Sequence, residues 1–180
     1  PSMTSELKID PLEARDPEIG RWLWALAEVR QRMLRLVQDC DLQLLDWRGP
    51  DGRENSIGSL LYHIAIVELS WLYLDLLRQE FPPEVNELLP IPMADEEGNV
   101  SQVSDMSLTE HLNRLHATRE IAFSIFQKMD LAEWRRLRPP VNEQNYETTP
   151  EWAIFHLIEH EAGHAFQISS LLRRWNRLQV

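Results

Sequence analysis

Four long stretches of this chain repeat their apolar residues at steps of three and four, and this spacing restricts the fold more than any other feature. Such steps place apolar side chains along one face of an α-helix. The first stretch carries Ile19, Leu23, Leu26, Met33 and Val37, with charged residues between them. The pattern predicts helices over about 17–39, 56–79, 108–129 and 150–175. Their number and length predict an all-α fold, specifically a four-helix bundle.

Capping patterns support these helix starts. Asp16 precedes Pro17, which is the order of an N-cap residue followed by proline at the first helical position. Ser107 and Glu110 have the spacing of a capping box, in which each side chain satisfies a free backbone N–H group of the first turn. The third helix therefore has the best-defined start in the sequence.

A long connection, about residues 81–105, separates the second and third predicted helices. It contains four prolines and the acidic turn Asp95-Glu96-Glu97-Gly98. Loops of this length often serve binding and could cover one end of a bundle. The alternative is a plain crossover between two parallel helices. Because no Gly/Ser-rich linker or internal repeat divides the chain, we expect one domain over residues 1–180.

Composition restricts the classes of partner. The 180 residues are 43% apolar and 26% charged, which is typical of a globular protein, and the formal net charge is -11. Nucleic-acid binding normally requires a basic face, so we expect no nucleic-acid partner, and we interpret the clusters Arg135–Arg138 and Arg173–Arg174 as solvated helix ends.

Cellular location follows from the same reading. We expect no apolar run long enough to span a bilayer and no signal peptide, so we expect no membrane partner and a cytoplasmic location. The single cysteine, Cys40, cannot form an internal disulfide. Because Cys40 lies on an apolar stripe, we interpret it as a small buried core residue.

The fourth predicted helix carries three histidines at successive four-residue steps, His156, His160 and His164. Each step of four drifts only about 40° around the helix axis, so the three share one side of the helix. Ala153 and Leu157 share that side too, which makes it the core side. Imidazoles directed into an apolar core need partners, and a His pair at i and i+4 can converge on one metal ion.

A third ligand must come from another helix. His63 is the best donor because it lies in the middle of the second, most apolar helix. His111 and His116 are weaker candidates, since a five-residue spacing sends them to different sides of their helix. We therefore predict a divalent-metal site at His63, His160 and His164. A lone buried histidine is more often hydrogen-bonded than metal-bound, so the prediction depends on all three together.

The segment His160-Glu161-Ala162-Gly163-His164 also matches the H-E-x-x-H motif of metalloproteases. Those enzymes normally need a further ligand downstream. No His, Asp or Glu follows His164 in the remaining sixteen residues. The metalloprotease is therefore a remote alternative.

Two segments resemble the DinB/YfiT-like superfamily of helical metal proteins. One is Ser56–Ala65 (SIGSLLYHIA) with Glu68 and Trp71 after it, and the other is His156–Ile168 (HLIEHEAGHAFQI). The resemblance implies a bundle that dimerises and binds zinc or nickel through His63, His160 and His164. It also implies activities such as thiol S-transfer with a low-molecular-weight thiol. Phe166 departs from the usual glycine, which leaves the substrate class open.

Our leading hypothesis is a divalent-metal-dependent thiol S-transferase or hydrolase that acts on a small molecule. The alternative is a non-catalytic, metal-stabilised dimeric bundle with a binding or stress-response role. Gln167 is placed to hydrogen-bond a ligand or substrate, and His156 is interpreted as lying near the site or on the surface. We interpret Glu161 as a solvated residue on the flank of the helix, with a general base as the alternative. Arg119 is interpreted as a side chain that reaches solvent, with anion binding as the alternative.

Overall fold

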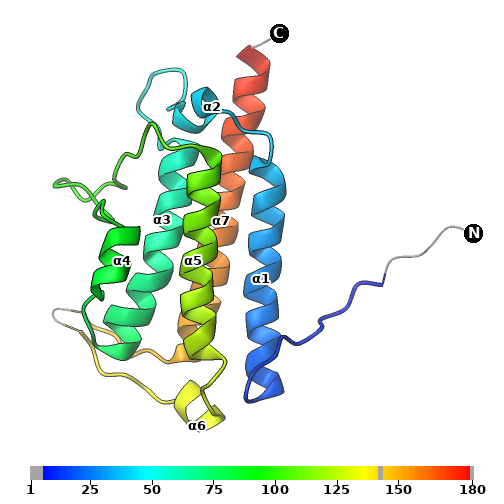
Figure 1. Cartoon of the computed structure of the whole chain (residues 1–180), viewed down its shortest axis with the longest axis vertical. Coiled ribbons are helices and arrows are strands. Elements are labelled where there is room, and N and C mark those ends of the chain that lie inside the picture. The colour runs from blue at the N-terminus through cyan, green and yellow to red at the C-terminus, as the bar shows by residue number, and fades with distance from the viewer. Residues whose placement is uncertain (1–5, 142–143, 179–180) are drawn as a thin grey trace, which may run out of the picture.

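The structure is a computed structural model, and it describes residues 6–141 and 144–178. Its four long helices lie side by side: α1 (Pro17–Val37), α3 (Ile57–Ser70), α5 (Leu108–Phe126) and α7 (Pro150–Leu178) (Figure 1). A π-helical segment, Trp71–Leu77, continues α3. Three short helices complete the structure: α2 (Leu42–Asp46), α4 (Pro83–Leu88) and α6 (Leu131–Trp134). The described residues otherwise form only isolated β-bridges, so the predicted all-helical class is confirmed.

Three of the predicted helices agree with α1, α5 and α7 to within three residues at either end, and the prediction 56–79 agrees equally well with α3 and the π segment taken together. Asp16 and Ser107 cap α1 and α5 as expected, and the capping box of Ser107 and Glu110 is complete. Helices α2 and α4 were not predicted. Helix α4 lies in the segment interpreted as a long connection, and both helices are too short to show helical periodicity in the sequence.

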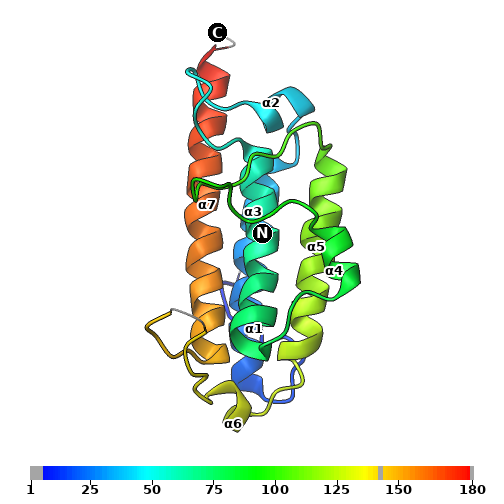
Figure 2. The same ribbon diagram turned by 90° about the vertical axis from the view of Figure 1, so that its left-hand side faces the viewer.

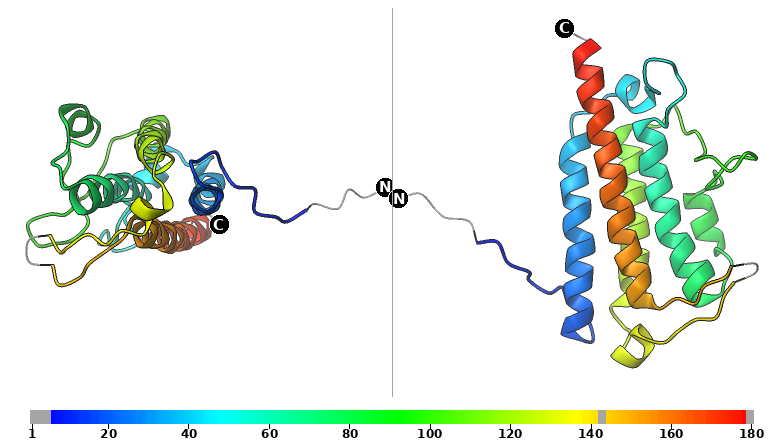
Figure 3. Two further views of the ribbon diagram at one scale, coloured as in Figure 1. Left: turned by 90° about the horizontal axis from the view of Figure 1, so that it is seen from below. Right: turned by 180° about the vertical axis from the view of Figure 1, so that it is seen from behind.

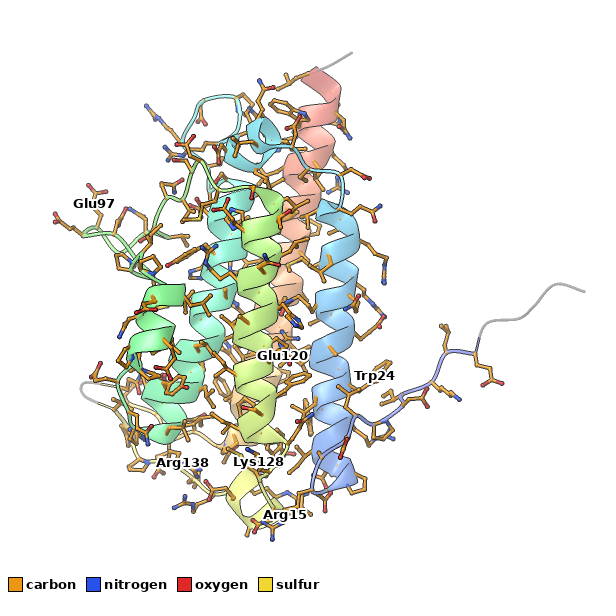
Figure 4. All side chains as sticks on the ribbon, viewed as in Figure 1. Arg15, Trp24, Glu97, Glu120, Lys128 and Arg138 are labelled. Atoms are coloured by element: carbon orange, nitrogen blue, oxygen red, sulfur yellow. The ribbon has the colours of Figure 1, made fainter. Side chains whose placement is uncertain are left out.

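The directions of the long helices explain the long connection. Helices α1 and α7 run one way, and α3 and α5 run the other way (Figures 1 and 2). Because α3 and α5 are parallel, the chain between them must return along the molecule, which confirms the crossover interpretation. Helix α4 belongs to this crossover and lies outside the four long helices (Figure 3), and Glu97 lies in the loop that projects furthest from them (Figure 4).

Helix α7 packs on α1 and α3, and α3 also packs on α5. The predicted apolar stripe of α1 is completely buried, and twelve of the fourteen residues of α3 are buried. Cys40 is 7% exposed, and burial, followed by the charges of Asp41 and Asp39, raises its thiol pKa to about 11. The interpretation of Cys40 as an inert core residue is therefore confirmed.

One sequence expectation about membranes was wrong. The continuous helix Ile57–Leu77 is long and apolar enough to cross a bilayer, although we expected no run of that length. In the structure, 67% of its most apolar window is buried within the protein. This is the behaviour expected of the central helix of a soluble protein, where the same apolar surface contacts neighbouring helices.

A buried network of four charges joins all four long helices. It comprises Arg30 of α1, Glu68 of α3, Arg119 of α5 and Glu161 of α7, none more than 7% exposed. Arg119 donates from Nε to Glu68 Oε2 at 2.8 Å and from Nη2 to Glu161 Oε2 at 2.9 Å. Arg30 donates from Nε to Glu161 and contacts Glu68 Oε2 at 3.5 Å.

The two arginines also bind the backbone. Arg30 Nη1 donates to the Leu115 carbonyl on α5, and Arg119 Nη1 donates to the Leu26 carbonyl on α1, both at 2.9 Å. These bonds cross between helices α1 and α5, which otherwise make few contacts with each other. The network, with a formal charge of zero, therefore connects parts of the core that apolar packing alone does not.

We expect the substitution Arg119→Met to lower the free energy of unfolding by about 3–5 kcal/mol, because it leaves buried carboxylates without their partner. The exposed pair of Arg32 and Glu28 provides the control, since its side chains are 69% and 33% exposed. Arg32→Met should cost less than about 1 kcal/mol. Urea unfolding followed by circular dichroism measures both, and equal losses in the two variants would contradict a structural role for the network.

Candidate metal centre

The structure brings the three predicted histidines together where α3 packs on α7. The Nε2 atom of His160 lies 3.2 Å from Nε2 of His63 and 3.0 Å from Nε2 of His164. One ligand atom from each of the three lies within 4.8 Å of the others. All three side chains are half-buried. His63 and Ser70 are the two residues of α3 that are not buried, so the site is open to solvent on one side.

These contacts cannot all be good hydrogen bonds. A neutral imidazole nitrogen offers either one proton or one lone pair, and each points along a single direction in the ring plane. Nε2 of His160 nevertheless faces two other ring nitrogens. Converging nitrogens of this kind are what a shared positively charged partner requires.

A hydrogen bond at Nδ1, the ring nitrogen that does not face the cluster, fixes the orientation of His164. Its Nδ1 lies 2.9 Å from Oε1 of Gln167, one turn further along α7. Because the amide oxygen only accepts, Nδ1 carries the proton and Nε2 keeps a lone pair. The prediction that Gln167 hydrogen-bonds this part of the site is therefore supported by its geometry.

The ring of His63 is oriented less strictly than that of His164. Its buried Nδ1 makes no well-aligned hydrogen bond, although the Met93 carbonyl of the crossover lies near enough to oppose in part the lowering of the His63 pKa by burial. The crossover therefore reaches the histidines through its backbone. Carbonyl groups commonly orient metal-binding imidazoles in this way.

All three imidazoles favour the neutral form. Burial, and secondarily the neighbouring His164, lowers the pKa of His63 to about 4. Burial and the two other histidines lower the pKa of His160 to about 3, and burial lowers the pKa of His164. At neutral pH the three therefore present lone pairs, which is the form that binds a metal ion.

Glu161 and Arg119 were both misinterpreted from the sequence. Glu161 is 2% exposed and lies within the buried network, so its interpretation as a solvated residue was wrong. Arg119 is 7% exposed, so it does not reach solvent as expected, and its bonds to Glu68 and Glu161 confirm the alternative that it meets an anionic group. A detectable signal existed, since each of these residues continues the apolar stripe of its helix at a three- or four-residue step.

This placement also argues against the metalloprotease alternative. In that mechanism the glutamate of H-E-x-x-H must face the ion-bound water. Here the carboxylate of Glu161 is bonded to Arg30 and Arg119 on the core side of α7. Glu161 is therefore not available as a general base beside His160 and His164.

A charged cavity of about 710 Å³ lies on the C-terminal side of the histidines along α7. Its lining includes Gln167, which also orients His164, and Phe166, which is 69% exposed. Arg174 and Glu54, both in its lining, form a two-bond ion pair at 2.5 Å. The volume is suitable for a small-molecule ligand. Phe166, the position at which this chain departs from the usual glycine, therefore contributes to the lining of this cavity.

The remaining histidines lie outside the cluster. His111 is 1% exposed and His116 is exposed, so the prediction that they occupy different sides of their helix is confirmed. His111 packs against Gly58 of α3, where an added Cβ would lie only 3.0 Å from its Nε2. His156 is half-buried, and its ring centroid lies 5.9 Å from that of His160.

Comparison with known proteins gives two matches. A family model described as the DinB superfamily matches residues 25–168, a segment that contains His63, His160 and His164. The chain is also similar to YkkA of Bacillus subtilis (strain 168), which is named an uncharacterized protein. The two are 25% identical over 163 residues, which cover 89% of this chain and 90% of YkkA.

His111 should make stability depend on pH. Burial, and secondarily Arg114, lowers its pKa from 6.5 to about 4, against the opposing charges of Asp46 and Glu110. Between these values the unfolded chain binds a proton that the folded chain does not, so the contribution of His111 is lost as pH falls from 6.5 toward 4. We expect the wild type to lose up to about 3 kcal/mol more than His111→Phe over this range. Urea unfolding at several pH values measures it, and parallel curves would contradict the prediction.

Proposed function

The chain belongs to the DinB superfamily, and from its histidine cluster we propose that it binds a divalent metal ion through His63, His160 and His164. The observation that carries the proposal is the convergence of three neutral ring nitrogens, one of which faces the other two. We interpret the four long helices as the four-helix bundle of this superfamily. Zinc and nickel are the ions we propose, since imidazole nitrogen suits both.

The spacing of the donors fits such an ion. Tetrahedral zinc binds imidazole nitrogen at about 2.0–2.1 Å, which holds two ligand nitrogens about 3.3 Å apart. The two Nε2 distances of 3.2 and 3.0 Å are close to this value. Three protein ligands with one open position are typical of catalytic rather than structural zinc sites.

For the reaction, we propose metal-dependent thiol S-transfer or hydrolysis on a small molecule. When bound, the ion would supply Lewis acidity, which activates a thiol or water for attack. Two features support a catalytic role over a purely structural one. The histidines are only half-buried, and Gln167 connects them to a cavity of about 710 Å³.

The chain's own residues would prepare this chemistry. The amide oxygen of Gln167 accepts a hydrogen bond from Nδ1–H of His164, so that Nε2 of His164 keeps its lone pair for the metal ion. Burial keeps His63 and His160 neutral. Because neutral ligands do not cancel the charge of a divalent ion, that charge would remain available to a substrate thiolate or carbonyl.

We expect near-stoichiometric zinc or nickel in protein purified without a metal-affinity column, measured by elemental mass spectrometry. His63→Ala and His160→Ala should each lose it, because each removes one of three ligands from the shared site. Incubation with either ion before measurement covers the case in which metal is lost during purification.

His156→Ala is the matched control. It removes a half-buried histidine on the same helix, one turn before His160, that lies outside the cluster. This variant should retain its metal. If the wild type takes up neither ion, or if His156→Ala loses metal as completely as His160→Ala, the proposed ligand set is wrong.

Gln167→Ala should weaken zinc binding about tenfold or more, because the partner that orients His164 is lost. Gln167→Glu keeps an oxygen acceptor in the same place and should retain most of the affinity. Phe166→Ala controls for changes at the neighbouring position, which is 69% exposed. Competition with a fluorescent zinc chelator measures all three. Equal affinities for Gln167→Ala and the wild type would show that this hydrogen bond has no role.

A further inference from the structure

A row of aromatic rings adjoins the histidine cluster on the side opposite the charged cavity. The cavity is lined by residues of α7 that follow His164, whereas the rings come from residues that precede His160. The ring centroids of Trp152 and His156 are 5.3 Å apart, and the rings are parallel to within 4°. The ring centroid of Trp71, the first residue of the π segment that continues α3, lies 4.9 Å from that of His156 and 5.4 Å from that of Trp152. We call Trp71, Trp152 and His156 the aromatic shelf.

The shelf is continuous with the proposed ligands. The His156 ring centroid lies 5.9 Å from that of His160, so adjacent rings lead from Trp152 to the cluster. A molecule that binds the histidines through one end would therefore have these rings beside its next portion. Direct contact with the site distinguishes the shelf from an isolated exposed side chain.

The shelf is both exposed and held in place. Trp152 is 45% exposed, and Trp71 and His156 are half-buried. His156 is fixed from behind through Nδ1, which lies 3.1 Å from Oε1 of Glu159. Trp71 packs against the hydrophobic core. An exposed apolar surface that is already rigid loses little conformational entropy when it binds a partner.

The backbone is irregular at the same place. The helix changes from α to π geometry at Trp71, and the π segment continues to Leu77. Wide turns of this kind are rare and occur frequently at functional sites. The irregularity begins at Trp71 itself, which supports a binding role for this residue.

We propose that the aromatic shelf binds a planar, apolar part of the substrate, such as an aryl group, while the reacting group lies at the histidine cluster. Flat unsaturated groups stack on parallel rings, whereas compact alkyl or strongly polar groups gain little from such a surface. The inference rests on the proposed metal site, since the ion would hold the reacting end. It assigns Trp152 a role in specificity.

Hydroxamates test this inference because they bind zinc through one end and carry a variable group at the other. We would titrate the zinc-loaded protein with acetohydroxamate and with 2-naphthohydroxamate by isothermal calorimetry. The naphthyl compound should bind about tenfold more tightly in the wild type, as a stacked aromatic pair implies. In Trp152→Ala the ratio should fall to about threefold or less, and in Trp152→Phe most of it should remain.

Phe155→Ala is the matched control, because Phe155 is also 45% exposed on α7 but is not part of the shelf. The naphthyl preference should persist in this variant. Equal affinity of the wild type for both hydroxamates, or a preference that Trp152→Ala leaves unchanged, overturns the shelf proposal alone. Failure of both compounds to bind protein of verified zinc content overturns the proposed open metal site, and the shelf proposal with it.

Discussion

The buried network of Arg30, Glu68, Arg119 and Glu161 is the constraint on which the arrangement of the helices depends. Each long helix contributes one charge, and each charge lies against an opposite charge from another helix. Apolar contacts tolerate small rotations of a helix, but an ion pair in a low-dielectric core does not, because a misplaced charge loses its partner and stays desolvated. The network therefore selects one rotation and one axial position for each helix.

This selection has a direct consequence for the metal centre. Glu161 and His160 are adjacent on α7, so their side chains leave the helix about 100° apart. With Glu161 fixed in the core by Arg30 and Arg119, His160 must point toward the boundary with α3, and His164 lies one turn above it. Glu68 fixes α3 in the same way, and His63 lies five residues earlier on that helix. The charges thus orient the histidines without contacting the proposed ion.

Much of this arrangement follows from the sequence, and the missing part has a physical reason. Helical periodicity and capping predict the four long helices, because both signals lie within one segment. The convergence of His63 with His160 and His164 is predictable because the most apolar helix carries a single, central histidine. The charge network is not, since the bonds of Arg30 to Glu161 join residues 131 positions apart. A local pattern shows that a charge occupies a core position, but it does not identify the partner.

The short helices and the π segment illustrate a second limit. Helix α4 has six residues, fewer than two turns, so packing decides its conformation rather than its own sequence. The π geometry after Ser70 likewise cannot be recognised from the sequence, because the mostly apolar segment Trp71–Leu77 lacks a helical periodicity that would distinguish it from an α-helix. The aromatic shelf also depends on contact between residues 81 positions apart, Trp71 and Trp152. Its residues are visible in the sequence, but their proximity is not.

The two flanks of the histidine cluster differ in chemistry, and the difference bears on substrate choice. The cavity side carries arginine and glutamate side chains, whereas the shelf side is aromatic. Neutral ligands would leave the charge of an ion between these two surfaces uncompensated, while the chain as a whole carries -11. Such an ion would be a local positive centre in a negative protein, which favours an anionic reacting group such as a thiolate at that point. A substrate with an ionisable reacting group and a flat apolar portion would satisfy both the ion and the shelf.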